Sequence, residues 1–254
     1  MSKKIAGLGI LVSALAGCSS TIVAVPTTES LGNIPTTFVA TYDAVGDTMT
    51  LDDGTTAIVL PRQAIYDGTT FKGYFLSNIS PNYAIYAVTP SGDGYALLAV
   101  RPGSSIAGTE FARLGDTELP GGGVVNYSGE YSAFVVADSS GLAGLLLFGD
   151  ADLAADFNAG TMSGVISNRV DFTNGRLTYA DLTLEASIIS GGAFSGTTTG
   201  GAASGTYTST TSAGEYSGLI VGPDGGEVVG GVVVGHIITG TTGPYTEYGA
   251  FVAD

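Results

Sequence analysis

Residues 214–235, GEYSGLIVGPDGGEVVGGVVVG, are the stretch that decides the fold. Residues typical of β-strands lie on both sides of a Gly-Pro-Asp-Gly-Gly turn. Pro223 presets φ for a turn and the pair 224–225 (Asp-Gly) tolerates positive φ, so the chain reverses here with little strain. Gly230 and Gly231 are costly inside a strand unless the backbone bends, bulges or meets another segment closely. The stretch therefore predicts the bent hairpin of a small barrel, with an ordinary Gly-rich hairpin as the alternative.

This hairpin resembles the signature of the barrel domains of transferrin-binding protein B and its wider family of bacterial surface lipoproteins. In that family a Gly-Pro pair leads to a Glu and then to a Gly-Gly pair. Gly222, Pro223, Glu227 and Gly230 match here, and Gly231 is a further structural residue of the signature. Ile220 and Val221 replace the family's aromatic pair, and Val229 stands where the family often has its first Gly. The resemblance implies an eight-stranded antiparallel β-barrel.

Other short motifs of the same family follow one another along residues 119–254. They are Leu119-Pro120-Gly121 with Tyr127–Tyr131, Ala155-Asp156-Phe157 with Gly160–Gly164, Phe194–Gly196, and Gly205–Tyr207. The resemblance places the barrel domain at 119–254. Such lipoproteins often carry a β-rich handle before the barrel, and we expect a small β-sheet handle subdomain at 36–118.

The amino terminus predicts export. Lys3 and Lys4 precede an apolar run, 5–14, that is too short to span a bilayer comfortably. The run 15–18 (Leu-Ala-Gly-Cys) resembles the lipobox of bacterial lipoproteins, which implies a signal peptide at 1–17 and diacylglycerol on Cys18. An ordinary secretion signal with an incidental Cys is the alternative. By the same resemblance, Ser19 implies the outer membrane, and the Ser-, Thr- and Pro-rich residues 18–35 predict a flexible tether.

The composition excludes some function classes. The chain has 254 residues and a net charge of −15, with 8 Lys and Arg against 23 Asp and Glu. Such a chain repels nucleic acid and could attract a basic partner. A hydrophobic fraction of 44% argues against disorder despite 40 Gly, and the length suffices for one or two domains with real cores.

Past residue 36 the chain predicts strands and no convincing helix. Alternation over Leu177–Ile188 predicts a strand whose buried face carries Ala180, Leu182, Leu184, Ala186 and Ile188. Hairpin turns are predicted at 53–54, 93–94, 174–175 and 224–225. Predicted handle strands are 48–51, 55–60, 74–76, 83–88 and 95–100. Predicted barrel strands are 124–137, 143–149, 152–158, 160–168, 177–188, 192–199, 204–220, 226–238 and 246–253, one more than eight, so one of them is expected to be superfluous or merged.

One internal echo fits a closed barrel. Residues 130–138, EYSAFVVAD, resemble residues 247–254, EYGAFVAD. These would be the first and last barrel strands, which pair when a barrel closes; coincidence is equally consistent with the small residue set of strands.

No enzyme constellation is evident, so we expect no catalysis, no metal and no cofactor. The chain has one His and one Cys, and no Gly-x-Ser-x-Gly, P-loop or His-Glu-x-x-His motif. The acidic residues within 43–53 favour solvated hairpin charges over a calcium loop. His236 is a candidate haem-iron ligand, against the alternative of a satisfied core or rim histidine. The segment Tyr83–Tyr86 could supply protein-binding anchors, or only strand packing.

The resemblance implies an outer-membrane-anchored surface lipoprotein that captures an iron-carrier protein, haem or another nutrient. Its expected partners are the membrane through the lipid, an extracellular protein or haem ligand, and a TonB-dependent receptor. The alternative is a structural, adhesive or host-factor-binding envelope lipoprotein with no nutrient ligand.

Overall fold

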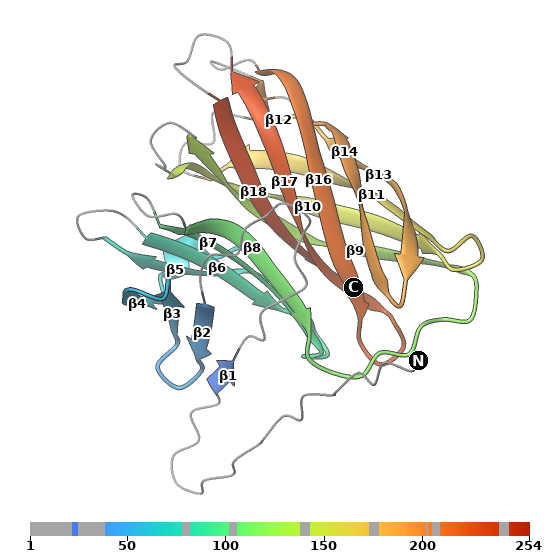
Figure 1. The fold of residues 1–254 in the computed structure, drawn as a ribbon, viewed down its shortest axis with the longest axis horizontal. Coiled ribbons are helices and arrows are strands. Elements are labelled where there is room, and N and C mark those ends of the chain that lie inside the picture. Colours follow the sequence, from blue (N-terminus) through green and yellow to red (C-terminus); the bar gives the residue numbers. More distant parts are fainter. Residues whose placement is uncertain are drawn as a thin grey trace, which may run out of the picture.

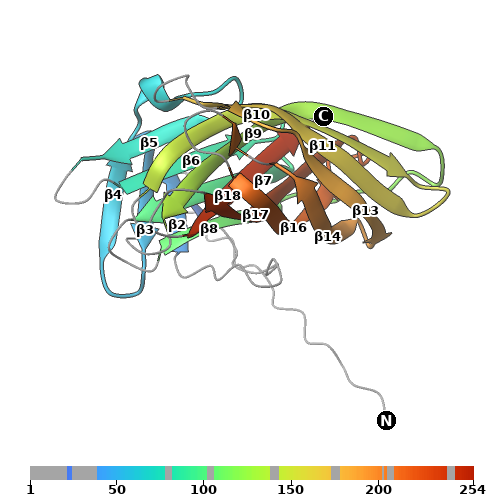
Figure 2. The same ribbon diagram turned by 90° about the horizontal axis from the view of Figure 1, so that it is seen from above.

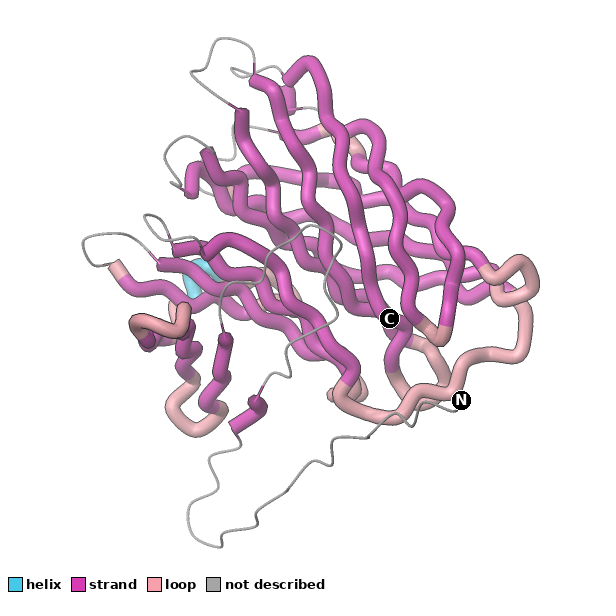
Figure 3. Tube along the Cα trace, in the orientation of Figure 1, coloured by secondary structure: helices cyan, strands magenta, loops and turns pink. Residues whose placement is uncertain are grey.

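The computed structural model describes residues 22–24, 39–77, 82–101, 106–137, 143–172, 178–201, 203–204, 209–238 and 244–254. Strands dominate these residues, joined by turns and loops, with one short 3-10 turn, η1 (Ala64–Tyr66) (Figures 1 and 3). Within the described part of the chain, no helix has the length and apolar character to cross a membrane. The predicted all-β class is therefore confirmed.

The carboxy-terminal half forms a closed antiparallel barrel of eight strands, as predicted. Its strands are β9 (Val124–Ala137), β10 (Ala143–Asp156), β11 (Thr161–Asp171), β13 (Leu182–Ser190), β14 (Ala193–Gly200), β16 (Ser209–Val221), β17 (Glu227–Ile238) and β18 (Pro244–Ala253). Neighbours in this order pair with each other, and β18 pairs with β9 to close the ring. Two short strands, β12 (Thr178–Tyr179) and β15 (Ala203–Ser204), extend the sheet beside β11.

Two smaller sheets precede the barrel, and we call residues 39–113 the handle. One handle sheet contains β2 (Val39–Asp43), β3 (Thr48–Asp52) and β4 (Ala57–Pro61), with β1 (Ile22–Ala24) paired to β2. The other contains β5 (Lys72–Leu76), β6 (Asn82–Val88), β7 (Gly94–Arg101) and β8 (Ile106–Arg113). The strands β2 and β8 were not predicted. The three residues of β1 fall within the range predicted as a tether.

The handle lies against the outside of the barrel (Figure 2). Three apolar cores result, stacked one behind the other. The first fills the barrel, the second lies between the barrel wall and the β5–β8 sheet, and the third lies between the two handle sheets. Strand β7 is buried on both faces, because Leu98 and Val100 belong to the second core and Leu97 and Ala99 to the third. The barrel wall is therefore one side of the handle's own core.

Two strand predictions were wrong in detail. The predicted strands 143–149 and 152–158 are one strand, β10, because the chain pairs with β9 in unbroken register from Leu145 to Asp156, and the bulge opposite Gly149 lies on β11 at Asn168 and Arg169. The predicted inward face of Leu177–Ile188 holds at Leu182 and Leu184, but Ala180 and Ala186 are exposed and Ile188 is 76% exposed. A register shift between Leu184 and Ile189 reverses the alternation there. Residue 177, the turn at 174–175 and the motif at 205–207 lie outside the described residues.

The signature hairpin has the geometry that its sequence requires. Gly222 and Gly225 have φ of +84° and +61°, and the Gly225 N–H donates to the Gly222 carbonyl at 3.2 Å. Gly230 lies under the ring of Phe251, where an added Cβ would be 2.3 Å from Cζ. The backbone thus meets another segment closely at Gly230. Gly231 is buried beside it and pairs with Ala250.

Candidate functional site

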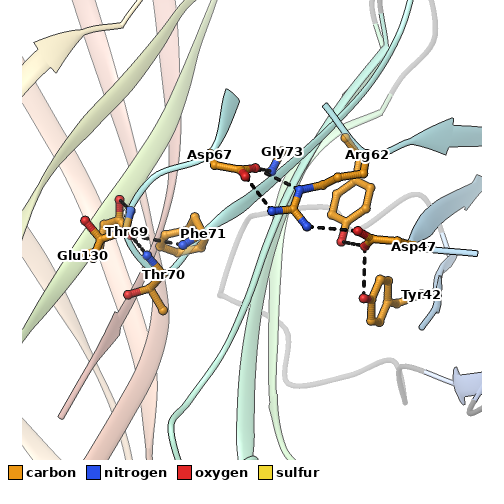
Figure 4. A network of polar contacts seen from close by, with 10 residues as sticks. Tyr42, Asp47, Arg62, Asp67, Thr69, Thr70, Phe71, Gly73 and Glu130 are labelled. Atoms are coloured by element: carbon orange, nitrogen blue, oxygen red, sulfur yellow. Dashed lines mark hydrogen bonds and ion pairs between the residues drawn. The ribbon is translucent and has the colours of Figure 1, made fainter. Parts of the chain in front are cut away.

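Two barrel glutamates hold turns of the handle. Glu227, the signature acid, accepts hydrogen bonds from the backbone N–H of Ser91 at 2.8 Å and from its hydroxyl at 2.6 Å. Glu130 accepts from the backbone N–H groups of three consecutive residues, 69–71, at 2.9, 2.5 and 3.1 Å (Figure 4). A carboxylate that accepts several backbone N–H bonds satisfies donors that packing would otherwise leave without partners. The handle and barrel are joined at both turns.

The turn held by Glu130 is fixed from the handle side as well. Arg62 donates from Nε and Nη2 to the two oxygens of Asp67, at 3.0 and 2.5 Å, and from Nη1 to Asp47 at 3.1 Å. Asp67 also accepts from the Gly73 N–H at 2.9 Å (Figure 4). Burial works against the charged form of Asp67, but the hydrogen bonds from Arg62 and Gly73 bring the pKa of its carboxyl below the ordinary value. The loop that enters β5 is therefore fixed at both ends.

The acidic stretch at 43–53 serves turns and ion pairs. Asp47, at φ +46°, accepts from the hydroxyls of Tyr42 and Tyr74 as well as from Arg62. Asp53 pairs with Arg101 at 2.7 Å. Across the residues that the structure describes, no group of three or more His, Cys, Asp or Glu could hold a metal ion.

A groove of about 570 Å³ opens where the handle meets the barrel, and we call it the seam groove. Its lining residues are Thr69 and Thr70 of the handle, Ser128–Glu130 of β9, Phe148–Asp150 of β10, and Asn168 and Val170 of β11. The volume is within the range of about 300–1,000 Å³ typical of ligand pockets. Because Glu130 both lines the groove and holds the handle turn, the groove has one wall from each part.

The floor of the groove is irregular at a bulge between β10 and β11. The register shifts between Phe148 and Asp150, and Asn168 adopts φ +51° opposite the shift. The Asn168 side-chain amide donates to Asp150 Oδ2 at 2.6 Å. A bulge re-aims side chains, and here it turns Asn168 outward while the next residue, Arg169, is fully buried.

A row of aromatic rings crosses the same seam. Phe148 contacts Phe172 edge to face at 5.4 Å between ring centroids, and Phe172 lies 6.2 Å from Tyr66 of the handle. Tyr66 lies 5.9 Å from Tyr83, which in turn lies 5.4 Å from Phe134 of β9. Phe172 is 40% exposed. Exposed aromatic rings beside a groove are typical of binding surfaces.

The predicted anchor segment Tyr83–Tyr86 is divided between two places. Tyr83 belongs to the aromatic row and is half-buried, whereas Tyr86 is buried in the core between the two handle sheets. Burial raises the pKa of Tyr86 to about 12, so it stays a neutral core residue at any physiological pH. Of the two tyrosines, Tyr83 is the one near the seam.

His236 lies inside the barrel, 1% exposed. Its Nε2 lies 2.7 Å from Oε2 of Glu247, and its ring lies 5.8 Å from that of Tyr179. Glu247 also accepts a hydrogen bond from Tyr131 at 2.7 Å and forms an ion pair with Arg169. Both charged side chains of that pair are fully buried. We call Arg169, His236 and Glu247 the interior charge cluster. A role of His236 in ligand binding stays a prediction.

The attraction between the members of the interior charge cluster offsets the cost of burying their charges. Burial alone would raise the pKa of Glu247, but Arg169, followed by His236, lowers it to about 2. Burial would lower the pKa of Arg169, but Glu247 raises it above the ordinary value. Arg169 Nη1 further donates to the carbonyls of Ala180 and Gly201, at 2.8 and 3.2 Å. The charges are thus paired and hydrogen-bonded, as buried charges must be.

Sequence reasoning missed most of these positions. Asp150 and Asn168 have no local signal, because their meeting depends on a bulge between two strands. Arg169 and Glu247 were missed as well, because the pairing of their charges inside the barrel depends on contact between two strands far apart in the chain. Cys18, the predicted lipid attachment site, lies outside the described residues.

Neither the protein-family models nor the curated proteins include one that matches this chain.

Proposed function

We propose that this chain is a lipid-anchored binding protein of the outer membrane. It binds its ligand at the cell exterior in the seam groove and does not catalyse a reaction. The observation that carries the proposal is the groove itself, with one wall from the handle and one from the barrel, joined by Glu130. No His or Cys is among its lining residues. A groove whose walls are fixed in advance spends little free energy on ordering when a ligand binds.

The chemistry of the seam favours a protein ligand. Aromatic residues are enriched in the centres of protein interfaces, and one ring of the row, Phe148, lines the groove with the 40% exposed Phe172 packed on it. Haem is less well supported, because His236 lies inside the barrel with Nε2 against Glu247. The resemblance to transferrin-binding lipoproteins supports an iron-carrier protein as the ligand and a TonB-dependent receptor as the second partner.

The anchoring part of the proposal rests on the sequence of 15–18 and on the basic, apolar start. The Cys18→Ala variant should lose the protein from the detergent phase of a phase-partitioning experiment, because no acyl chain can be attached. Continued partitioning of that variant into detergent would remove the lipoprotein assignment and leave the binding role to be judged separately.

The binding role is tested with the full chain as bait. Phe172→Ser removes the most exposed ring of the row, and Ile237→Ser, at a 59% exposed position of β17 outside the groove, is the matched control. Candidate extracellular proteins, including iron carriers, are titrated against immobilised protein, and absorbance is recorded for haem. We expect a protein ligand whose affinity falls at least tenfold with Phe172→Ser and is unchanged with Ile237→Ser. Equal binding by both variants would contradict a site at the seam.

The alternative role, adhesion or host-factor binding without a nutrient, uses the same surface. It is favoured only if the ligand carries no iron or haem and if deletion of the receptor gene leaves growth on the ligand unchanged. A growth defect on an iron-loaded ligand supports nutrient capture instead.

A further inference from the structure

The seam groove carries negative charge without a compensating cation in its lining. Asp150 is exposed on its floor, and Asp152, two residues further along the same face of β10, is also exposed. Glu130 lines the groove between them and the handle. None of the ten lining residues is Lys or Arg. The whole chain is strongly acidic as well, with a net charge of −15, so the local field is not reversed from a distance.

A neighbouring side chain holds the Asp150 carboxylate in position. The Asn168 amide donates to Oδ2 at 2.6 Å and orients the carboxylate at the bulge. Asn168 reaches it from a left-handed backbone conformation that most residues adopt only at a cost. The carboxylate is thereby held on the outer face of the barrel, at the floor of the groove.

Aromatic rings border the same carboxylate. Phe148 lines the groove next to Asp150 and packs edge to face on Phe172, and Val170 lies in the lining between the strands. Phe172 and Val170 are 40% and 37% exposed. An aromatic face attracts a cation through its quadrupole, and guanidinium stacks on such rings while donating to carboxylates.

From this combination we propose that the seam groove binds a basic segment of a partner protein, with an arginine side chain placed between the Asp150 carboxylate and the rings of Phe148 and Phe172. This inference rests on the proposed binding function and names the chemistry of its ligand. Arginine suits the site better than lysine, because its planar fork can pair with a carboxylate and stack on a ring together. An anionic ligand would meet repulsion at Asp150.

The test uses the purified full chain and fluorescent peptides. Oligo-arginine, oligo-lysine and oligo-glutamate peptides of equal length are titrated by fluorescence anisotropy at low and at physiological salt. The two groove variants are Asp150→Asn and Phe172→Ser. The matched controls are Asp181→Asn, an exposed Asp outside the groove, and Ile237→Ser. Circular dichroism melting is recorded for every variant, so that a folding defect is recognised.

We expect oligo-arginine to bind more tightly than oligo-lysine, and oligo-glutamate not to bind. Each groove variant should weaken oligo-arginine binding by about fivefold to tenfold, or about 1 kcal/mol at 1.4 kcal/mol per tenfold. The controls should change it less than twofold. Asp150→Asn should also reduce the salt dependence of binding.

Equal losses in Asp150→Asn and Asp181→Asn would overturn the inference, because diffuse negative charge would then explain the binding. A folded partner protein whose binding requires Phe172, but is unaffected by Asp150→Asn and by competing oligo-arginine, would also overturn it. That second result leaves the proposed binding function standing, so the two failures can be told apart.

Discussion

Glu247→Gln tests whether the interior charge cluster stabilises the barrel. The carboxylate of Glu247 is fully buried and has three partners, Arg169, His236 and Tyr131. The amide keeps the shape but removes the charge, which leaves Arg169 as a buried cation without its counter-ion. Breaking a buried pair in this way costs about 3–5 kcal/mol. Unfolding by urea at pH 7 measures the loss, with Glu215→Gln on the exposed face of β16 as the control.

The pH dependence of the free energy of unfolding is a second test of the same buried ion pair. The pKa of Glu247 is about 2 in the folded protein against an ordinary value of 4.5. A depressed carboxyl pKa contributes stability that is fully present above pH 4.5 and is lost as the pH falls through 2. The direction of this dependence follows from Arg169 and His236, which favour the charged form of Glu247 in the folded protein. The variant should lose this acid dependence.

A double variant keeps the reasoning testable if the single variant does not fold. Arg169→Met with Glu247→Met removes both charges of the pair, and replacing a buried pair by apolar residues is often neutral or stabilising. We expect the double variant to be more stable than Glu247→Gln. The account of the cluster is wrong if the free energy of unfolding of Glu247→Gln at pH 7 is within 1 kcal/mol of the parent's. It is also wrong if the double variant is less stable than Glu247→Gln.

Three further predictions concern other positions. Gly230→Val should destabilise by roughly 3 kcal/mol, because its Cβ would meet an aromatic ring and a backbone carbonyl, whereas Gly226→Val, with no atom within 4 Å, should melt within a few degrees of the parent. Burial raises the pKa of Glu110 to about 7, so the parent should lose stability as the pH rises from 4.5 through 7, and Glu110→Gln should be the more stable protein at pH 8 in chemical denaturation; identical pH profiles would argue against this. Glu227→Ala should lower the free energy of unfolding by about 1–3 kcal/mol and speed hydrogen exchange at Ser91, because the Ser91 N–H donates to the Glu227 carboxylate; unchanged exchange there would mean that the handle turn is held by packing alone.

The strands could be predicted from the sequence because they follow from period-two patterns and turn chemistry, and their closure into a barrel was implied by the family resemblance. The turn at 224–225 and the merging of nine barrel segments into eight strands are of this kind. The similarity between 130–138 and 247–254 indicated the two strands that close the barrel, and β9 and β18 do pair with each other. The strand and turn signals are local, so no long-range contact had to be known for them.

The same echo shows why side-chain roles could not be predicted. Glu130 faces outward and holds the handle, whereas Glu247, its counterpart in the echo, faces the barrel interior. Phe134 and Phe251 differ in the same way, since one packs under the handle and the other fills the barrel. A shift of one residue exchanges the two faces of a strand, and only the complete sheet fixes that parity. The seam groove depends further on a bulge and on handle docking, neither of which has a local pattern.

The stacking of the three cores has a consequence for how the protein acquires its structure. The handle precedes the barrel in the chain, and one face of its β5–β8 sheet is covered only by the barrel wall. That wall is complete only when β18 pairs with β9, strands separated by more of the chain than any other pair in the barrel. During folding, the apolar face of the handle therefore stays uncovered until the last strand has paired. Such a long-range closure is slow and leaves apolar surface open to aggregation in the meantime. Substitutions late in β18 should thus govern folding yield as strongly as substitutions in the handle itself.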